Sequence, residues 1–302
     1  SWIPTTSSTV IRQADTFTSA SGILATSVTD STPTWSVGTT YALGDIVQRF
    51  GRKYQSLQNA NTGNGPVTST TWWLDIGPNN IYACFDKQVS TVTSMASVNF
   101  IQYGIRTLVT GLSGGIGVLG VTGSSDSMYP ITVRVAIYNE STGALSTASK
   151  VLADSTATNA VFGGMTTSGS IVSIRIDASA TGTLTVSTIA AGQLTDIGST
   201  QYGASAGIID YSKKETDEFG TTTFVERAYS KRLNAQVVVP NTQLNTVQKL
   251  LYSLRATPAV WVGSDDSNFD EALTVYGFYR DFSTDIAYPA HSICNLEIEG
   301  LT

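Results

Sequence analysis

Aromatic residues gathered between positions 35 and 77 have the types and spacing that best fit a chemical task, stacking against the flat faces of sugar rings. They are Trp35, Tyr41, Tyr54, Trp72 and Trp73. The small sheet that this stretch can form covers only one face, so some rings are expected to face solvent. We expect these residues, with Asn59 nearby, to form a carbohydrate-binding surface whose most exposed members are Trp35 and Trp72. The alternative is that the two tyrosines and Trp73 form the core of the module, because aromatic rings carry most of the buried area in a tiny domain.

Two glycine-containing motifs suggest catalysis or cofactor binding, but neither has the context that it needs. Gly111-Leu-Ser113-Gly-Gly115 matches the GxSxG nucleophile elbow, and His291 follows it in the required order. Residues 115–120 match the GxGxxG pattern of a dinucleotide site. Both motifs require a strand that leads into a helix. Gly123 and Pro130 oppose a helix after the second motif, and the first lacks the predicted parallel sheet with flanking helices. We therefore predict no hydrolase chemistry and no dinucleotide site.

Two acidic segments are the remaining candidates for metal binding or catalysis. Residues 213–218 mix acids with lysines, which predicts a solvated loop whose charges balance. A second segment could bind calcium through Asp265, Asp266, Asp270 and Glu271, but it lacks the glycine and ligand spacing of an EF-hand loop. A glycosidase needs two carboxylates across a sugar cleft, and a sequence does not give that distance. We predict a protein that is not an enzyme, with no cofactor and no metal site.

The composition excludes several classes of partner. The 302 residues carry 17 Lys and Arg against 23 Asp and Glu, a net charge of −6, whereas nucleic acids and anionic membranes bind basic surfaces. Only 13% of the residues are charged, below the usual quarter, as in β-rich extracellular or virion proteins. Cys84 and Cys294 lack metal-binding spacing, and Cys294 is predicted to be a buried thiol. No run reaches the roughly 18 apolar residues of a membrane span, and the first residues do not resemble a signal peptide. These features favour release from the producing cell by lysis.

Polar and alternating patterns predict that the first 80 residues hold two parts. Residues 1–34 are rich in Ser and Thr, which predicts an extended arm, with a disordered tail as the alternative. Residues 35–80 form the aromatic module. Within it, the alternating runs 45–48 and 53–57 are predicted to pair as strands joined through Gly51.

Residues 81–200 are predicted to form a β-sandwich of jelly-roll type. Apolar and polar side chains alternate over 131–138, the period of a half-buried strand. Similar runs recur at 98–101, 105–109, 171–176 and 184–189. Residues 139–143 supply a hairpin turn. Many short strands separated by Gly, Ser and Thr turns are typical of such a sandwich.

Residues 201–302 are predicted to form an α+β domain with one main helix. Leu244, Val247, Leu251 and Leu254 share one helical face. Asn241 is placed to cap the helix, and Thr257 before Pro258 ends it. Residues 259–263, 273–278 and 292–299 are predicted strands, so the helix covers a mostly antiparallel sheet. The predicted fold class is therefore mainly β, with three domains after the arm.

The aromatic module resembles the small type 3 chitin-binding modules of secreted chitinases. The matching residues are Trp35, Tyr41, Gly44-Asp45, Val47, Gly51, Tyr54, Pro66, Trp73 and Gly77. The resemblance implies a compact β fold and binding of a polysaccharide through aromatic rings. The family usually has a further Trp pair after the second tyrosine, where this chain has residues 57–60 without a tryptophan. The resemblance therefore supports the fold more strongly than chitin binding.

The last third resembles tail-associated proteins of tailed bacteriophages, which often carry a carbohydrate-binding module near their N-terminus. The similar segments are 201–207, 213–218 and 276–281. The resemblance implies a virion structural protein of a tail or baseplate that contributes to host-surface attachment. Its expected partners are other tail proteins, host glycan and copies of itself, and residues 201–302 would anchor it. One alternative is a purely structural subunit whose module is a spacer or a subunit contact. Another is a secreted polysaccharide-binding accessory protein.

Overall fold

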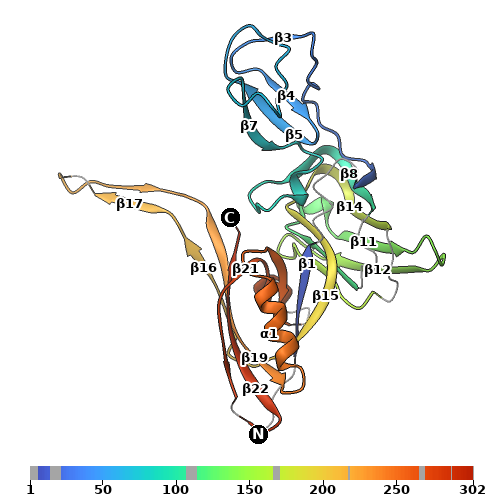
Figure 1. Ribbon diagram of the computed structural model, residues 1–302, viewed down its shortest axis with the longest axis vertical. Helices are drawn as coiled ribbons and strands as arrows, with labels where there is room; N and C mark the ends of the chain where they lie inside the picture. Colours follow the sequence, from blue (N-terminus) through green and yellow to red (C-terminus); the bar gives the residue numbers. More distant parts are fainter. Residues whose placement is uncertain are drawn as a thin grey trace. The chain divides into compact units, whose positions relative to one another are not determined.

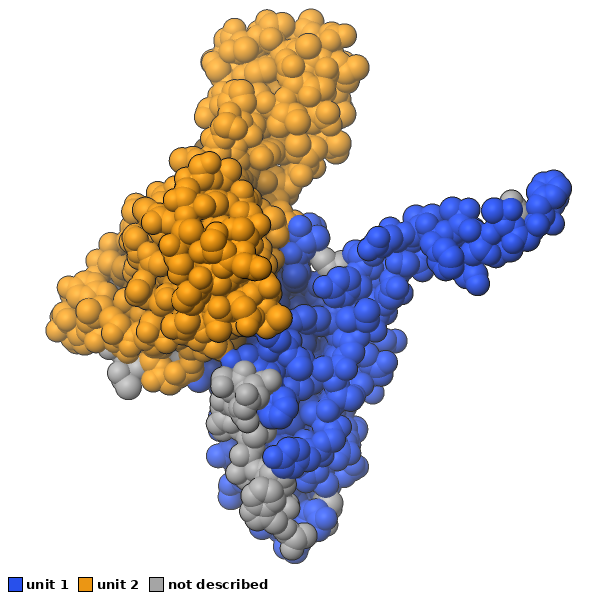
Figure 2. Space-filling view, turned by 180° about the vertical axis from the view of Figure 1, so that it is seen from behind, with its two compact units in different colours: residues 1–13, 87–90, 190–302 blue, residues 14–86, 91–189 orange. Residues whose placement is uncertain are grey.

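The computed structural model describes residues 6–13, 22–106, 114–165, 171–216, 218–264, 269–286 and 288–301. The chain divides into two compact units, coloured separately in Figure 2. Unit 1 contains residues 1–13, 87–90 and 190–302, and unit 2 contains residues 14–86 and 91–189. Antiparallel strands dominate both units, and one main helix stands among them. The predicted fold class, mainly β with one main helix, is confirmed.

The aromatic module of unit 2 consists of five short strands in two small sheets (Figure 1). They are β3 (Thr40–Tyr41), β4 (Ile46–Arg49), β5 (Arg52–Ser56), β6 (Asn61–Thr62) and β7 (Trp73–Pro78). Strands β4, β5 and β7 form one sheet in that order, and β3 pairs with β6 in the other. Phe50 and Gly51 join β4 to β5 with φ of 51° and 80°. Positive φ at both central residues matches the right-handed twist of the flanking strands. The predicted hairpin through Gly51 is therefore confirmed.

A larger antiparallel sheet forms the rest of unit 2, in the order β12-β11-β14-β8-β2, with β10 paired to β14. Its strands are β2 (Ile23–Thr26), β8 (Thr93–Arg106), β10 (Thr122–Gly123), β11 (Ile131–Tyr138), β12 (Leu145–Leu152) and β14 (Ile171–Val186). Every second residue of β11 is buried, as the alternation predicts. The hairpin turn at 139–143 is also confirmed, because the Gly143 amide donates to the Asn139 carbonyl over 2.8 Å. In the same unit β9 (Gly114–Leu119) pairs with β13 (Ala160–Phe162), and short 3-10 helices occupy Ala83–Phe85 and Asp126–Met128.

Unit 1 is built on a ring of six antiparallel strands. They are β1 (Thr6–Gln13), β15 (Thr188–Thr200), β19 (Tyr229–Pro240), β20 (Ala259–Val262), β21 (Thr274–Asp285) and β22 (His291–Gly300). The order is β15-β1-β20-β21-β22-β19, and β15 also pairs with β19. These pairings close the sheet into a small barrel. Helix α1 (Leu244–Ser253) follows β19, and the short α2 (Asp270–Leu273) precedes β21.

The barrel and α1 share one apolar core. Val247 and Leu251 of the helix, and Leu254 at its C-terminal cap, pack in one cluster with barrel residues that include Trp261 and Cys294. The predicted helix and the buried Cys294 are therefore confirmed, and burial raises the pKa of that thiol. The predicted cap is wrong, since Gln243 precedes the helix and makes no side-chain cap. Asn241 instead donates to the carbonyls of Tyr288 and Pro289 and accepts from the Ser292 hydroxyl.

The N-terminal residues differ from the predicted arm. Thr6–Gln13 form β1, which pairs with β15 on one side and β20 on the other. Ile23–Thr26 form β2 and pair with β8. Both segments thus find backbone hydrogen-bond partners in their own chain, which satisfies groups that an extended arm would leave to solvent or a neighbour. No helix in the described part of the chain is long and apolar enough to cross a bilayer.

A two-stranded extension leaves the barrel within unit 1. It is built from β16 (Ser205–Asp210) paired with β19, followed by the hairpin of β17 (Lys213–Thr216) and β18 (Thr222–Val225). Between the two pairs the Tyr211 amide donates to the Ala228 carbonyl over 3.3 Å. The described residues 205–216 and 218–229 thus form one antiparallel ribbon, drawn in orange in Figure 1. We call this segment the ribbon.

Candidate functional site

Three of the six predicted carbohydrate-binding residues form the core of the aromatic module. Trp73, Tyr54 and Tyr41 are only 2%, 6% and 8% exposed. The rings of Tyr41 and Trp73 meet edge to face, with centroids 5.2 Å apart. The Trp73 indole N–H donates to the Asn64 carbonyl over 2.9 Å, and burial raises the pKa of Tyr54. In this arrangement none of the three rings offers a face to a sugar.

The other three predicted residues lie nearer the surface. Trp35 and Trp72 are half-buried and pack against the module core. The guanidinium of Arg49 lies over the Trp35 ring, with Cζ 4.3 Å from its centroid, and so covers one face. Asn59 is exposed, but its side-chain oxygen accepts a hydrogen bond from the Leu43 amide over 2.9 Å. Trp72, unlike Trp35, has no cation over its ring among the described contacts.

Among the described residues, the motifs that suggest catalysis lack the strand-to-helix setting that they require. Residues 111–113 of the GxSxG match lie outside the described residues, and the GxGxxG match lies on and just after strand β9 rather than before a helix. His291 is exposed at the start of β22. Asp270 and Glu271 form the first turn of α2, whereas Asp265 and Asp266 fall outside the described residues. Among the residues that the structure describes, no group of three potential ligands could hold a metal ion.

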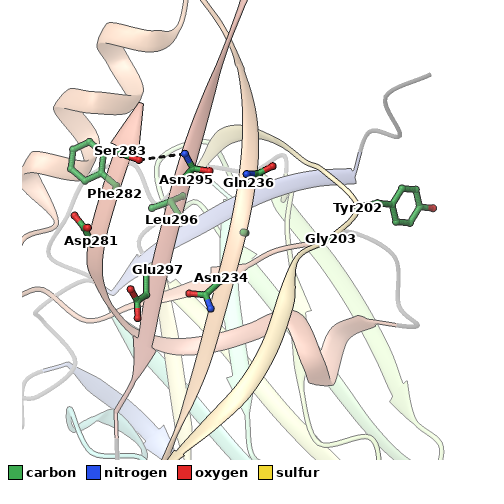
Figure 3. A pocket seen from close by; sticks show the side chains of 11 residues that line it. Tyr202, Gly203, Asn234, Gln236, Asp281, Phe282, Ser283, Asn295, Leu296 and Glu297 are labelled. Carbon is green, nitrogen blue, oxygen red and sulfur yellow. Dashed lines mark hydrogen bonds between the residues drawn. The ribbon is translucent and has the colours of Figure 1, made fainter. Parts of the chain in front are cut away.

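An open pocket of about 490 Å³ lies over β19, β21 and β22 of the barrel (Figure 3). Cross-strand pairing lines it with polar side chains, including Asn234, Glu297, Asn295 and Ser283. Asn295 donates to the Ser283 hydroxyl over 3.3 Å, and Glu297 pairs with Arg232 over 3.3 Å. The serine thus meets an amide and no base, which is not the pairing of an activated nucleophile. This pocket is therefore an open surface lined mainly by polar side chains.

The ribbon presents the large apolar side chains that a binding surface needs. Every described residue of β17 and β18 is exposed. Phe219 is 91% and Phe224 is 74% exposed, and Ile208 and Tyr229 are exposed nearer the barrel. Large apolar groups gathered in solvent are typical of interaction sites. Sequence reasoning missed this surface because the lysines and acids of 213–218 suggested a solvated loop. The missed signal was the pair of phenylalanines flanking Gly220 and the threonines.

Two comparisons with known proteins give no match. No protein-family model matches the chain, and no curated protein is similar to it. The resemblances to chitin-binding modules and to phage tail proteins therefore stay predictions. The geometry of the ribbon, the barrel and the module carries the functional argument.

Proposed function

We propose that this chain is a structural subunit of a phage tail or baseplate, which assembles with copies of itself and with other tail proteins. The observation that carries the proposal is the ribbon. It extends from a closed barrel and exposes aromatic and aliphatic side chains on an isolated pair of strands. A subunit with a prominent exposed contact surface is suited to building a particle.

The physical chemistry of the ribbon supports assembly. A two-stranded hairpin is at best marginally stable in water without a third strand or a packed face. Fully burying one large apolar side chain contributes about 1.5–3 kcal/mol, so Phe219, Phe224 and Ile208 together represent a large unused driving force. A neighbouring subunit that covers the ribbon would both order it and use this free energy.

The oligomeric state of the purified chain tests self-assembly. We expect sedimentation velocity to show oligomers whose population rises with protein concentration. A chain that stays monomeric at every concentration, with its fold intact by circular dichroism, would contradict self-assembly. Electron microscopy of the same samples would show whether the oligomers are closed rings or open fibres.

The position in a virion rests on the resemblance of residues 201–302 and on the acidic, β-rich composition. Immunogold electron microscopy of lysate particles tests it, with antibody raised against residues 201–302. We expect gold at one end of the tail. Label confined to free protein, on particles that stay clean, would overturn the virion assignment and favour a secreted polysaccharide-binding protein released by some other route.

Host-surface glycan attachment through the aromatic module is a second candidate function. The half-buried Trp72, whose ring no described cation covers, favours it. A single ring of this kind binds sugar weakly, so adhesion would require several modules in one assembly. Replacing Trp72 with Ala is expected to abolish binding of assembled protein to host polysaccharide, while Phe50→Ala, an exposed ring of the same module, leaves binding intact. Equal binding by both variants would leave the module as a spacer or subunit contact.

A further inference from the structure

A small apolar pocket lies at the foot of the ribbon, within unit 1. Its volume is about 260 Å³, and its lining includes Tyr202, Ala204, Ala206, Phe269, Ala272 and Leu273. One water molecule takes about 30 Å³ of liquid volume, so the pocket has room for a single large side chain. Small and aromatic walls of this kind favour an apolar occupant over a polar one.

Two acidic residues are interleaved in the chain with residues that line this pocket. Asp270 and Glu271 form the first turn of α2, directly between the lining residues Phe269 and Ala272. The Glu271 backbone carbonyl accepts from Lys231. The two acids outnumber this one cation, so a side chain that enters the pocket beside α2 is favoured when a positive charge accompanies it.

The far end of the ribbon carries a side chain with these two properties. Phe224 is 74% exposed, and Lys214 is its direct cross-strand neighbour. The Lys214 ammonium lies 5.9 Å from the centroid of the Phe224 ring. Lys214 makes no ion pair with the described residues of its own chain. The ribbon thus presents an apolar knob with a cation beside it, and the pocket presents an apolar cavity with acids beside it.

A ribbon does not reach the pocket of its own chain. Ala206 lines the pocket and Lys214 lies eight residues further along the same ribbon, a distance of about 26 Å at about 3.3 Å per residue. We propose that Phe224 of one copy inserts into the pocket at the foot of the ribbon in a second copy, with Lys214 facing Asp270 and Glu271. The inference rests on the proposed self-assembly and names the contact that produces it.

This contact joins two different surfaces and is therefore heterologous. Each copy offers one ribbon and one pocket, so the contact repeats from copy to copy. Repetition closes into a ring if the rotation between neighbours allows it, and otherwise gives an open fibre. A contact between two identical surfaces would instead stop at a dimer. The size of the assembly therefore distinguishes the two kinds of contact.

Complementary variants test the head-to-tail contact. Phe224→Ala removes the knob, and Ala206→Phe fills the pocket from an exposed strand position that suits an aromatic residue. We expect each variant alone to assemble at least about 30-fold more weakly than the unmodified chain, the effect of losing an interface hot spot. A mixture of the two still contains one intact ribbon and one intact pocket, and is expected to form one-to-one dimers in native mass spectrometry. Phe50→Ala, which removes a similarly exposed ring elsewhere, should assemble normally.

A charge exchange gives a second test that leaves the pocket volume unchanged. Lys214→Glu and Asp270→Lys are each expected to weaken assembly, and the double variant is expected to recover it. Circular dichroism and intrinsic tryptophan fluorescence confirm that each variant is folded. If the unmodified chain assembles and the variants assemble equally well, this contact is wrong while the proposed self-assembly stands. If the unmodified chain stays monomeric, both proposals fail.

Discussion

The aromatic module and the ribbon are two small antiparallel pieces of the same chain that place their large apolar residues in opposite ways. The module turns Tyr41, Tyr54 and Trp73 inward, whereas the ribbon leaves Phe219 and Phe224 in solvent. The difference follows from the number of strands in each piece. The module's five strands form two sheets, so one face of each can be covered. The ribbon has two strands, and both of its faces stay open.

This comparison separates the number of aromatic residues from their availability. The module has more aromatic residues and drew the functional prediction, but Tyr41, Tyr54 and Trp73 are buried in its own core. The ribbon has four aromatic residues, and two of them, Phe219 and Phe224, are 91% and 74% exposed. A binding surface in a β protein is therefore better sought on strands whose faces no other part of the chain covers.

The largest expected effect on stability is that of Trp73→Ala in the module. The side chain is fully buried and donates a hydrogen bond, so its loss leaves a cavity in a core of only a few residues. Replacing a buried aromatic with Ala costs about 3–5 kcal/mol, enough to unfold so small a module. Hydrogen exchange of peptides covering 41–57 should become fast, while peptides covering 131–138 keep their protection. Unchanged protection of the module would show that its core lies elsewhere.

An intermediate effect is expected at Asp30, which ties the two ends of the module together. Its carboxylate accepts from the Asn80 amide over 2.7 Å and from the Thr32 amide over 2.8 Å, and it pairs with Lys53 over 3.2 Å. The side chain is only 3% exposed. Burial raises the pKa of Asp30, but these hydrogen bonds and the ammonium outweigh burial and lower the pKa from 3.8 to about 2.

The lowered pKa of Asp30 predicts a pH dependence with a definite sign. A carboxyl whose pKa is lower in the folded state stabilises the fold above its unfolded pKa, and this contribution is lost as pH falls from about 4 to about 2. The contribution at neutral pH is about 2 kcal/mol. Asp30→Asn should destabilise the module by a similar amount and flatten its stability between pH 4 and pH 2. Asp75→Asn, which breaks a mostly exposed pair with Arg52, should cost less than about 1 kcal/mol.

Local patterns in the sequence predicted much of the fold. The alternation of β11, the apolar face of α1 and the Gly51 hairpin each involve residues close together in the sequence, so local patterns predict them. The pairing of β1 with β15 and β20 was not readable, because it joins segments far apart in sequence. The division into units is discontinuous for the same reason.

The candidate sites were less predictable than the fold. The sequence identified Trp35 as a ring available to sugar, but the bridge between Thr34 and Gln48 brings it beside Arg49, which covers one face. The sequence did not predict the exposed position of Phe224, because its charged and threonine neighbours in the sequence are equally typical of loops and of two-stranded ribbons. Availability depends on which strands lie nearby, and that is a property of the tertiary structure.

The smallest expected effect on stability is that of Phe224→Ala in the ribbon, and it sharpens the comparison with Trp73. Because the ring is exposed and contacts chiefly Lys214, its removal should change the free energy of unfolding of the isolated chain by no more than about 0.5 kcal/mol. Urea denaturation below the concentration of assembly measures this. A large loss of stability in the monomer would mean that Phe224 packs within its own chain. A small loss joined to failed assembly would show that the ring acts only between copies.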